Sequence, residues 1–179
     1  MANSLEFIDS VNSTSNTTTV TFDNIFSDKY NNYFLTVTGF EPALSEELGF
    51  RLINSSGSVL NGNNYDSSSY TLSTSATFGE VQDQNKDKWR YGGYAQHDSN
   101  TGFAASMLIY NPYNSSSHTY AFLSSSQGHN QYIGRKVLYV YRVAETINAI
   151  RIFEATASHN ISGTATLFGV KKLWVVWDF

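Results

Sequence analysis

The chain has no cysteine among its 179 residues. Disulfide bonds and thiolate metal sites are therefore excluded, and stability has to come from the hydrophobic core and from contacts between subunits. Charged residues make up only 15% of the chain, and its eleven Lys and Arg residues are scattered along the sequence. Because no basic stripe is present to neutralise phosphates, we do not expect DNA or RNA as a partner.

Long hydrophobic runs are also missing. The longest, such as LWVVW near the end of the sequence, fall far short of the ~20 apolar residues that cross a bilayer. The opening MANSLEFIDS has neither the basic leader nor the apolar region of a secretory signal. These features predict a soluble protein that is made in a cytoplasm and does not insert into a membrane.

The local signatures of common enzymes are absent as well. No G-x-S-x-G elbow, G-x-G-x-x-G loop, Walker loop or H-E-x-x-H motif occurs. His97, Asp98 and Ser99 are adjacent in sequence, so their side chains cannot form a catalytic relay. Glu46 and Glu47 are neighbours too, and we expect them on a solvated helical turn, where they point apart. We therefore expect no enzymatic activity, no catalytic residue and no cofactor.

One segment resembles the opening of a calcium loop. Asp83, Asn85 and Asp87 have the required D-x-N-x-D spacing, but Lys88 stands where the loop needs Gly and Tyr94 where it needs Glu. The four histidines are far apart in sequence and show no ligand spacing. No metal is expected.

Asn, Ser and Thr are abundant, with 17, 24 and 16 residues, and aromatic residues add 15%. This composition is typical of β-strands joined by turns rich in hydroxyl and amide groups. The length corresponds to about one domain. We therefore treat residues 1–179 as a single folded unit, in which residues 171–179 form an apolar C-terminal strand used for assembly.

Apolar and polar residues alternate along most of the chain, the period of a β-strand with one buried face. In one example, Tyr33, Leu35 and Val37 share a face. The predicted strands are Leu5–Ile8, Thr17–Phe22, Tyr33–Thr38, Leu48–Asn54, Tyr70–Thr74, Ala105–Asn111, His118–Ser124, Val137–Val143, Ala149–Ala155, Thr164–Val170 and Leu173–Trp177. Single helical turns are expected at Pro42–Leu48 and Ala144–Asn148. The pattern predicts an all-β fold: a jelly-roll-like sandwich of two antiparallel sheets with about ten strands.

The segment Gly79–Gly102 interrupts the alternation for 24 residues. Unstructured loops of this length are uncommon and often functional. It contains the candidate binding residues Trp89, Arg90, Tyr91, Tyr94 and His97, whose rings would stack on a partner or glycan while the polar groups give directional hydrogen bonds. In the alternative interpretation, the same aromatics form an irregular strand pair that covers the core.

The tail KKLWVVWDF is apolar on both faces of a strand. A strand of this kind must be covered on both sides. The candidate oligomer or docking residues are Trp174, Trp177 and Phe179, which would bind a neighbouring subunit or another protein. In the alternative, the tail is a central strand buried within its own domain.

Four motifs, in order, resemble elements of a family of jelly-roll-like structural proteins from the virions of tailed bacteriophages, especially marine phages and cyanophages. They are FDNIFSDKYNNYFLTV, LGFRLINSSGSVLNGNNYD, MLIYNPYNSSSHTYAFLSS and AIRIFEATASHNISGTATLFGV. Each is a strand and turn pattern, so their order and spacing carry the resemblance. Phe168 replaces the usual Tyr before the closing Gly, and the tail runs past the usual end.

The resemblance implies a non-enzymatic virion protein that is made in the host cytoplasm. Its members usually assemble as symmetric oligomers, often homotrimers, on the capsid or tail. We expect this chain to be a compact surface protein, either a capsid decoration (cement) protein or a short tail-fibre knob. The implied partners are other copies of the chain and other capsid or tail proteins, with contact to a host-surface glycan during adsorption as an extension. Two other functions stay open: a carbohydrate-binding adhesion module of a tail fibre, and a glycan depolymerase with paired acids.

Overall fold

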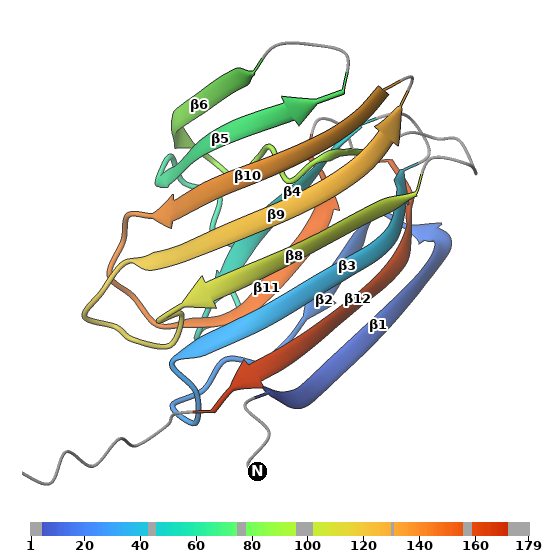
Figure 1. Ribbon diagram of the computed structural model, residues 1–179. Helices are drawn as coiled ribbons and strands as arrows, with labels where there is room; N and C mark the ends of the chain where they lie inside the picture. Colours follow the sequence, from blue (N-terminus) through green and yellow to red (C-terminus); the bar gives the residue numbers. More distant parts are fainter. Residues whose placement is uncertain are drawn as a thin grey trace, which may run out of the picture.

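The computed structural model describes residues 5–42, 46–74, 78–95, 102–129, 131–155 and 159–171. Within these ranges the chain is all-β, with antiparallel strands in two sheets (Figure 1). The strands are β1 (Leu5–Thr17), β2 (Thr19–Phe22), β3 (Asn32–Pro42), β4 (Glu46–Asn54), β5 (Tyr65–Ser73), β6 (Gly79–Lys86), β7 (Tyr94–Ala95), β8 (Phe103–Tyr110), β9 (Thr119–His129), β10 (Gln131–Tyr141), β11 (Ile147–Glu154) and β12 (Ile161–Val170). These ranges contain no helix that is long and apolar enough to span a membrane.

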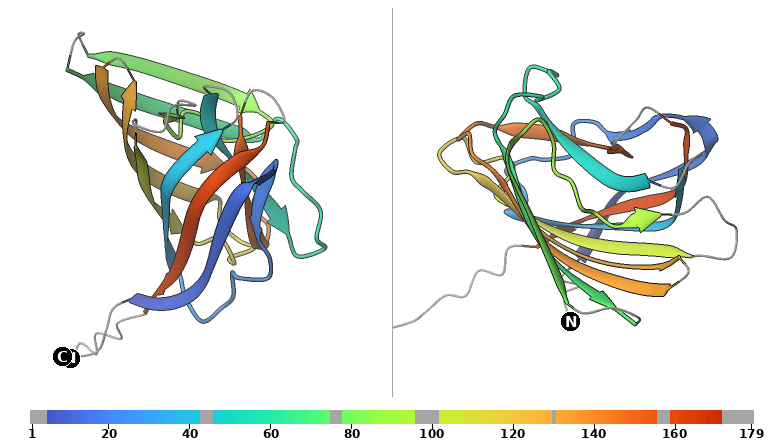
Figure 2. Two further views of the ribbon diagram at one scale, coloured as in Figure 1. Left: turned by 90° about the vertical axis from the view of Figure 1, so that its right-hand side faces the viewer. Right: turned by 90° about the horizontal axis from the view of Figure 1, so that it is seen from above.

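The strand order is that of an extended jelly roll. The large sheet has eight strands in the order β1-β12-β3-β8-β9-β10-β5-β6, and the small sheet has the order β2-β11-β4-β7. When β5, β6, β9 and β10 are set aside, the other eight strands form two sets of four, β1-β12-β3-β8 and β2-β11-β4-β7, which is the jelly-roll arrangement. The four additional strands all widen the same sheet, which gives the molecule one broad outer face (Figures 1 and 2).

The predicted alternation places the core between the sheets. On β3, Tyr33, Leu35 and Val37 are buried, whereas Phe34 and Thr36 on the opposite face are partly exposed. The strands beside β3 repeat the pattern, and their inward side chains pack on those of β4 and β11 from the small sheet. The prediction of an all-β, two-sheet sandwich is confirmed.

A glycine pair accommodates an irregularity where β3 meets β12. The register shifts between Ser162 and Thr164, and Gly163 at this point has a φ of +131°, which L side chains rarely adopt. A Cβ at Gly163 would lie 2.8 Å from the carbonyl oxygen of Gly39, which itself has a φ of +61°. The two strands therefore approach closely because Gly163 has no Cβ, whereas a Cβ at Gly39 would meet no atom within 4 Å.

Several local predictions were wrong. Gly79–Gly102 contains β6 and β7, so the interpretation as one long loop is wrong and the alternative of irregular strands in this segment agrees with the structure. Pro42–Leu48 and Ala144–Asn148 are not helical in the described residues: Glu46–Leu48 begins β4, and a connection without regular structure precedes β11. A short window with Ala and Glu satisfies helix propensity, but pairing with neighbouring strands decides the structure. The predicted strand Leu173–Trp177 lies outside the described residues.

Substitution by phenylalanine is expected to have different effects on stability at two buried tyrosines. The hydroxyl of Tyr65 accepts a hydrogen bond from the Leu52 N–H at 3.1 Å and donates one to the Leu60 carbonyl at 2.9 Å. Tyr139 is also fully buried, but its hydroxyl has no hydrogen-bond partner among the described residues. We expect Tyr65→Phe to cost about 1–3 kcal/mol, because it leaves buried polar groups unpaired, and Tyr139→Phe to be neutral or stabilising. Urea denaturation of both variants checks this, and an equal loss for the two would contradict it.

Because of the same two tyrosines, we expect the fold to lose stability at alkaline pH. Burial raises the pKa of the Tyr139 hydroxyl well above its ordinary value of 10.0, and burial raises that of Tyr65 as well. Below pH 10 the two tyrosines are protonated in the folded and in the unfolded chain, and their contribution to the free energy of unfolding is complete. Above it the unfolded chain releases protons that the folded chain retains, so stability falls as pH rises. Tyr139→Phe should make that fall less steep in denaturation curves measured between pH 9 and 11, and an unchanged slope would count against the assignment.

Candidate functional site

Trp89 is a core residue, so its predicted role in partner or glycan binding is wrong. Its side chain is fully buried, and the indole stacks on the Tyr139 ring at 5.2 Å with an interplanar angle of 21°. The indole N–H donates to the Val140 carbonyl at 3.0 Å, and the backbone forms a bridge with Phe50 on β4. The alternative interpretation, that this aromatic covers the core, holds for Trp89 because β4 and β10 enclose it.

Of the other four predicted binding residues, the structure describes the side chains of Arg90 and Tyr91. Tyr91 is only partly exposed, has a φ of +64° and lies under the Arg90 guanidinium, which is 5.3 Å from its ring centroid. Burial raises the pKa of the Tyr91 hydroxyl above its ordinary value. The backbone of Tyr94 lies in β7, whereas its side chain and the whole of His97 lie outside what the structure describes.

Arg90 belongs to a charged cluster formed by Glu47, Asp83, Arg90 and Arg135. Arg135 on β10 donates to the Glu47 carboxylate on β4 at 2.8 Å. Arg90 lies 3.8 Å from the same carboxylate and 3.5 Å from Asp83 on β6. Lys86 also lies 3.6 Å from the Asp83 carboxylate. Both carboxylates of the cluster are therefore ion-paired, and neither is free for catalysis. Its effect is to tie β4 of the small sheet to β6 and β10 of the large sheet.

This cluster also corrects the expectation for Glu47. Sequence analysis placed Glu47 on a solvated helical turn, but its side chain is only 14% exposed and points to Arg135. The β4 strand, not a helix, sets its direction, because β4 pairs with β7 over Glu46 and Glu47. The side chain of Glu46 is outside what the structure describes.

The residues with calcium-loop spacing engage basic groups instead. Asp83 contacts Arg90, and the Asp87 carboxylate accepts a hydrogen bond from Arg51. Asn85, with a φ of +56°, accepts a hydrogen bond from Arg142. In the part of the chain that the structure describes, no group of three His, Asp or Glu side chains is placed to hold a metal ion.

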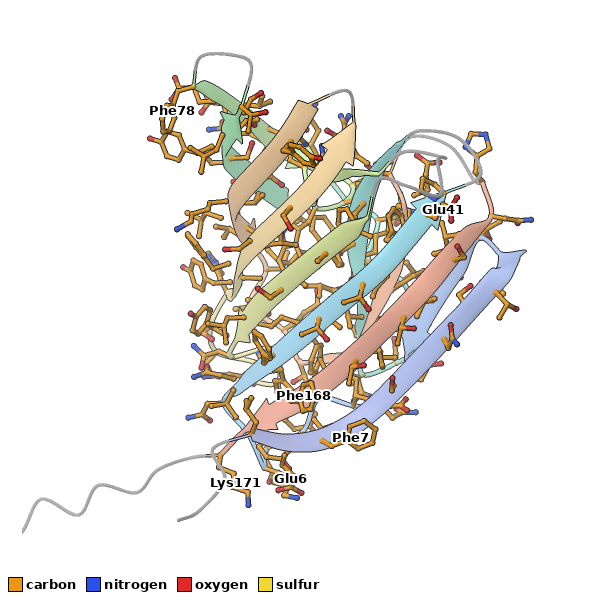
Figure 3. All side chains as sticks on the ribbon, turned by 45° about the vertical axis from the view of Figure 1, so that its right-hand side comes forward. Glu6, Phe7, Glu41, Phe78, Phe168 and Lys171 are labelled. Atoms are coloured by element: carbon orange, nitrogen blue, oxygen red, sulfur yellow. The ribbon has the colours of Figure 1, made fainter. Side chains whose placement is uncertain are left out.

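The outer face of the large sheet carries the feature that sequence analysis missed. One cross-strand row of this face, here named the apolar row, consists of Phe7, Phe168, Phe34, Leu108, Phe122 and Leu138, each paired in register with the next on β1, β12, β3, β8, β9 and β10. Phe7 is 60% exposed, Phe122 44% and Leu138 45%. Figure 3 shows Phe7 and Phe168 side by side on this face, and their ring centroids are 6.1 Å apart. Six adjacent strands therefore present apolar side chains to solvent.

A second row of residues crosses the same face, two positions along the strands from the apolar row. This hydroxyl row consists of Ser10, Thr166, Thr36, Ser106 and Ser124 on five adjacent strands, again in register. The hydroxyls of Ser10 and Thr166 hydrogen-bond at 2.9 Å. Neither row contains a charged residue on β12, β3, β8 or β9. The outer face therefore presents an apolar strip beside a hydroxyl strip, which is unusual for a solvent-exposed sheet.

A smaller aromatic site lies where β10 pairs with β5. Tyr132 is 75% exposed and Tyr70 59%, and both lie on the outer face. Gly134, opposite Leu72, lies two residues along β10 from Tyr132 and leaves the sheet without a side chain there. Tyr70 pairs with Lys136, four residues from Tyr132, so Gly134 and the exposed Leu72 lie between the two rings. We call this aromatic site the platform of Tyr70 and Tyr132.

The sequence contained a signal for the apolar row. The segments YFL, MLIY, YAFL, VLYV and LF are apolar at consecutive positions, so these strands are apolar on both faces at one end. The predicted docking residues Trp174, Trp177 and Phe179 lie outside the described residues.

In comparisons with known proteins, no family model matches the chain and no curated protein matches its sequence.

Proposed function

We propose that the chain is a structural component of a tailed-phage virion, a compact surface protein that assembles as a symmetric oligomer. The observation that carries the proposal is the outer face of the large sheet, where the apolar row is exposed on six adjacent strands. A monomer in water gains nothing from such a strip, whereas an assembled protein buries it. The ordered virion-like motifs and the jelly-roll strand order support the same proposal.

The proposed role requires no catalysis. The carboxylate of Glu47 is ion-paired with arginines, as is that of Asp83. A glycosidase needs one carboxylic acid and one carboxylate across an open cleft. Glu47 and Asp83 are both ion-paired with basic side chains, so this pair does not support the depolymerase interpretation.

Electron cryo-microscopy of purified virus particles tests the proposal, with this protein located by a tagged copy. We expect density in stoichiometric amounts on the capsid lattice or on the tail. Density over the lattice identifies a decoration protein, and density confined to the tail identifies a fibre knob that meets the host. Absence of the protein from purified particles would overturn the proposal.

The second candidate is a carbohydrate-binding adhesion module, and the platform of Tyr70 and Tyr132 favours it. Exposed aromatic rings stack on sugar faces, and Lys136 opposite Tyr70 supplies a hydrogen-bond donor. We expect any glycan binding, measured on a glycan array and by calorimetry, to fall at least tenfold in Tyr132→Ala and to be unchanged in the matched control Phe7→Ala. Equal binding by both variants would rule out this platform as the glycan site.

A further inference from the structure

The sequence contains a second apolar segment besides the apolar row. Residues 172–179, which follow the last described residue Lys171, contain the run LWVVW, with Leu173, Val175 and Trp177 on one face of an extended strand and Trp174 and Val176 on the other. A strand with two apolar faces requires a cover. The apolar row requires one as well, because it is exposed on the described surface.

The dimensions of the two surfaces agree. Six strands separated by ~4.8 Å place the ends of the apolar row roughly 24 Å apart. Eight residues in extended conformation span about 26 Å at ~3.3 Å per residue. The tail of one copy is therefore long enough to cross the whole row.

The row is also chemically suited to an apolar segment. Its members on β12, β3, β8 and β9 are Phe168, Phe34, Leu108 and Phe122, with no charge among them or in the adjacent hydroxyl row. Covering the row therefore desolvates no charged side chain there, which would otherwise oppose docking. Tryptophan is the residue that most often anchors such contacts.

The place where the described chain ends argues for a neighbouring copy as the source of the tail. Val170 is the last residue of β12 and pairs with Leu5 and Asn32 at the end of the sheet, where Lys171 lies 3.9 Å from Glu6 (Figure 3). To reach its own row, the chain would have to reverse over Phe168 within two or three residues. Lys171–Trp177 contains no Gly, Pro, Asn, Asp or Ser, the residues that build tight reversals, and is rich in residues that favour extended strands.

We propose that the apolar row of one copy binds the tail of a second copy, residues 172–179. Each copy then donates one tail and receives one, and closure of this exchange gives a symmetric oligomer. The inference rests on the oligomeric part of the proposed function, but purified protein alone tests it. Absence from virus particles would overturn the virion role and leave this exchange intact.

The absence of cysteine permits a direct test, because any disulfide formed must come from introduced residues. Leu108→Cys lies in the middle of the row, and Val175→Cys lies in the tail and keeps both tryptophans. When the two single variants are mixed and oxidised, we expect a covalent dimer of twice the 20.0 kDa chain mass. Tyr132→Cys, an exposed aromatic site outside the row, is the matched control and should give no dimer with Val175→Cys.

The double variant Leu108→Cys/Val175→Cys distinguishes the alternative. If it closes within one chain at monomer mass and the mixed single variants do not cross-link, the tail covers its own row and the exchange is wrong. If neither forms a disulfide, the row is not the tail's site and the inference is overturned.

Self-association gives an independent readout. Deletion of residues 172–179 should weaken it at least ~30-fold in light-scattering measurements over a concentration series, because two Trp anchors are lost. Phe122→Ser should have an effect of the same direction, since Phe122 lies exposed in the row. Tyr132→Ser should leave the dissociation constant unchanged. An oligomer that survives the deletion would contradict the proposal.

Discussion

Replacing Trp89 with alanine is expected to destabilise the fold by about 3–5 kcal/mol, the usual cost of removing a buried tryptophan. The indole packs on two rings of the large sheet, stacking on Tyr139 at 5.2 Å and meeting Tyr65 edge-on at 5.8 Å. Truncation leaves a cavity between the sheets and removes the hydrogen bond from the indole N–H to the Val140 carbonyl. Because folded domains are stable by only about 5–15 kcal/mol, this single change removes a large share of the total.

Trp89→Phe separates packing from hydrogen bonding. Phenylalanine keeps an aromatic ring but not the N–H donor to Val140, so we expect an intermediate loss of about 1–3 kcal/mol. Both values come from urea denaturation followed by circular dichroism. If Trp89→Ala unfolded at the same urea concentration as the original protein, the residue would not have the buried position described here.

The expected instability also affects how binding experiments are interpreted. Loss of glycan binding in Trp89→Ala would have looked like evidence for a stacking contact. Since the side chain is fully buried, such a loss would report unfolding. Tyr70 and Tyr132 are better positions to replace, because they are exposed and their substitution leaves the core in place.

Much of the fold could be predicted from the sequence because alternation is a local signal. Tyr33, Leu35 and Val37 alternate with partly exposed neighbours, and burial follows that pattern. Strand β6 was missed because its eight residues, GEVQDQNK, are largely polar, as expected for the last strand of a sheet. Strand β7 has two residues and leaves almost no pattern. Edge and short strands depend on their partners, which the sequence does not show.

The candidate surface was harder to predict than the fold. The apolar row joins residues as distant in sequence as Phe7 and Phe168, and the register that aligns them is a property of the assembled sheet. The jelly-roll connections place β1 beside β12 and β3 beside β8. Residues that are adjacent in this part of the row therefore lie far apart in the sequence. For Trp89 the sequence left both a binding contact and a core position open, because composition alone cannot separate a buried aromatic from an exposed one.

Replacing Glu47 with glutamine is expected to be the second most damaging change, at about 2 kcal/mol. Glu47 and Arg135 are only 14% and 16% exposed, and their ion pair is 2.8 Å long. Without the carboxylate, Arg135 and Arg90 face each other with Asp83 as the only remaining anion of the cluster. Loss of one partner of a buried ion pair costs about 3–5 kcal/mol, and the partial exposure here reduces that figure.

A thermodynamic cycle with Arg135→Met measures the coupling directly. If the two side chains stabilise each other, the double variant Glu47→Gln/Arg135→Met should lose less stability than the sum of the single variants, by about 1 kcal/mol or more. The exposed pair Lys29–Glu6, with side chains 59% and 36% exposed, is the matched control, and Glu6→Gln should leave the midpoint of urea denaturation close to that of the original protein. Additive losses at Glu47 and Arg135 would mean that the cluster does not tie the sheets together. Measured coupling would make this pair the electrostatic link that holds β4 against the widened sheet, and hence the outer face in its shape.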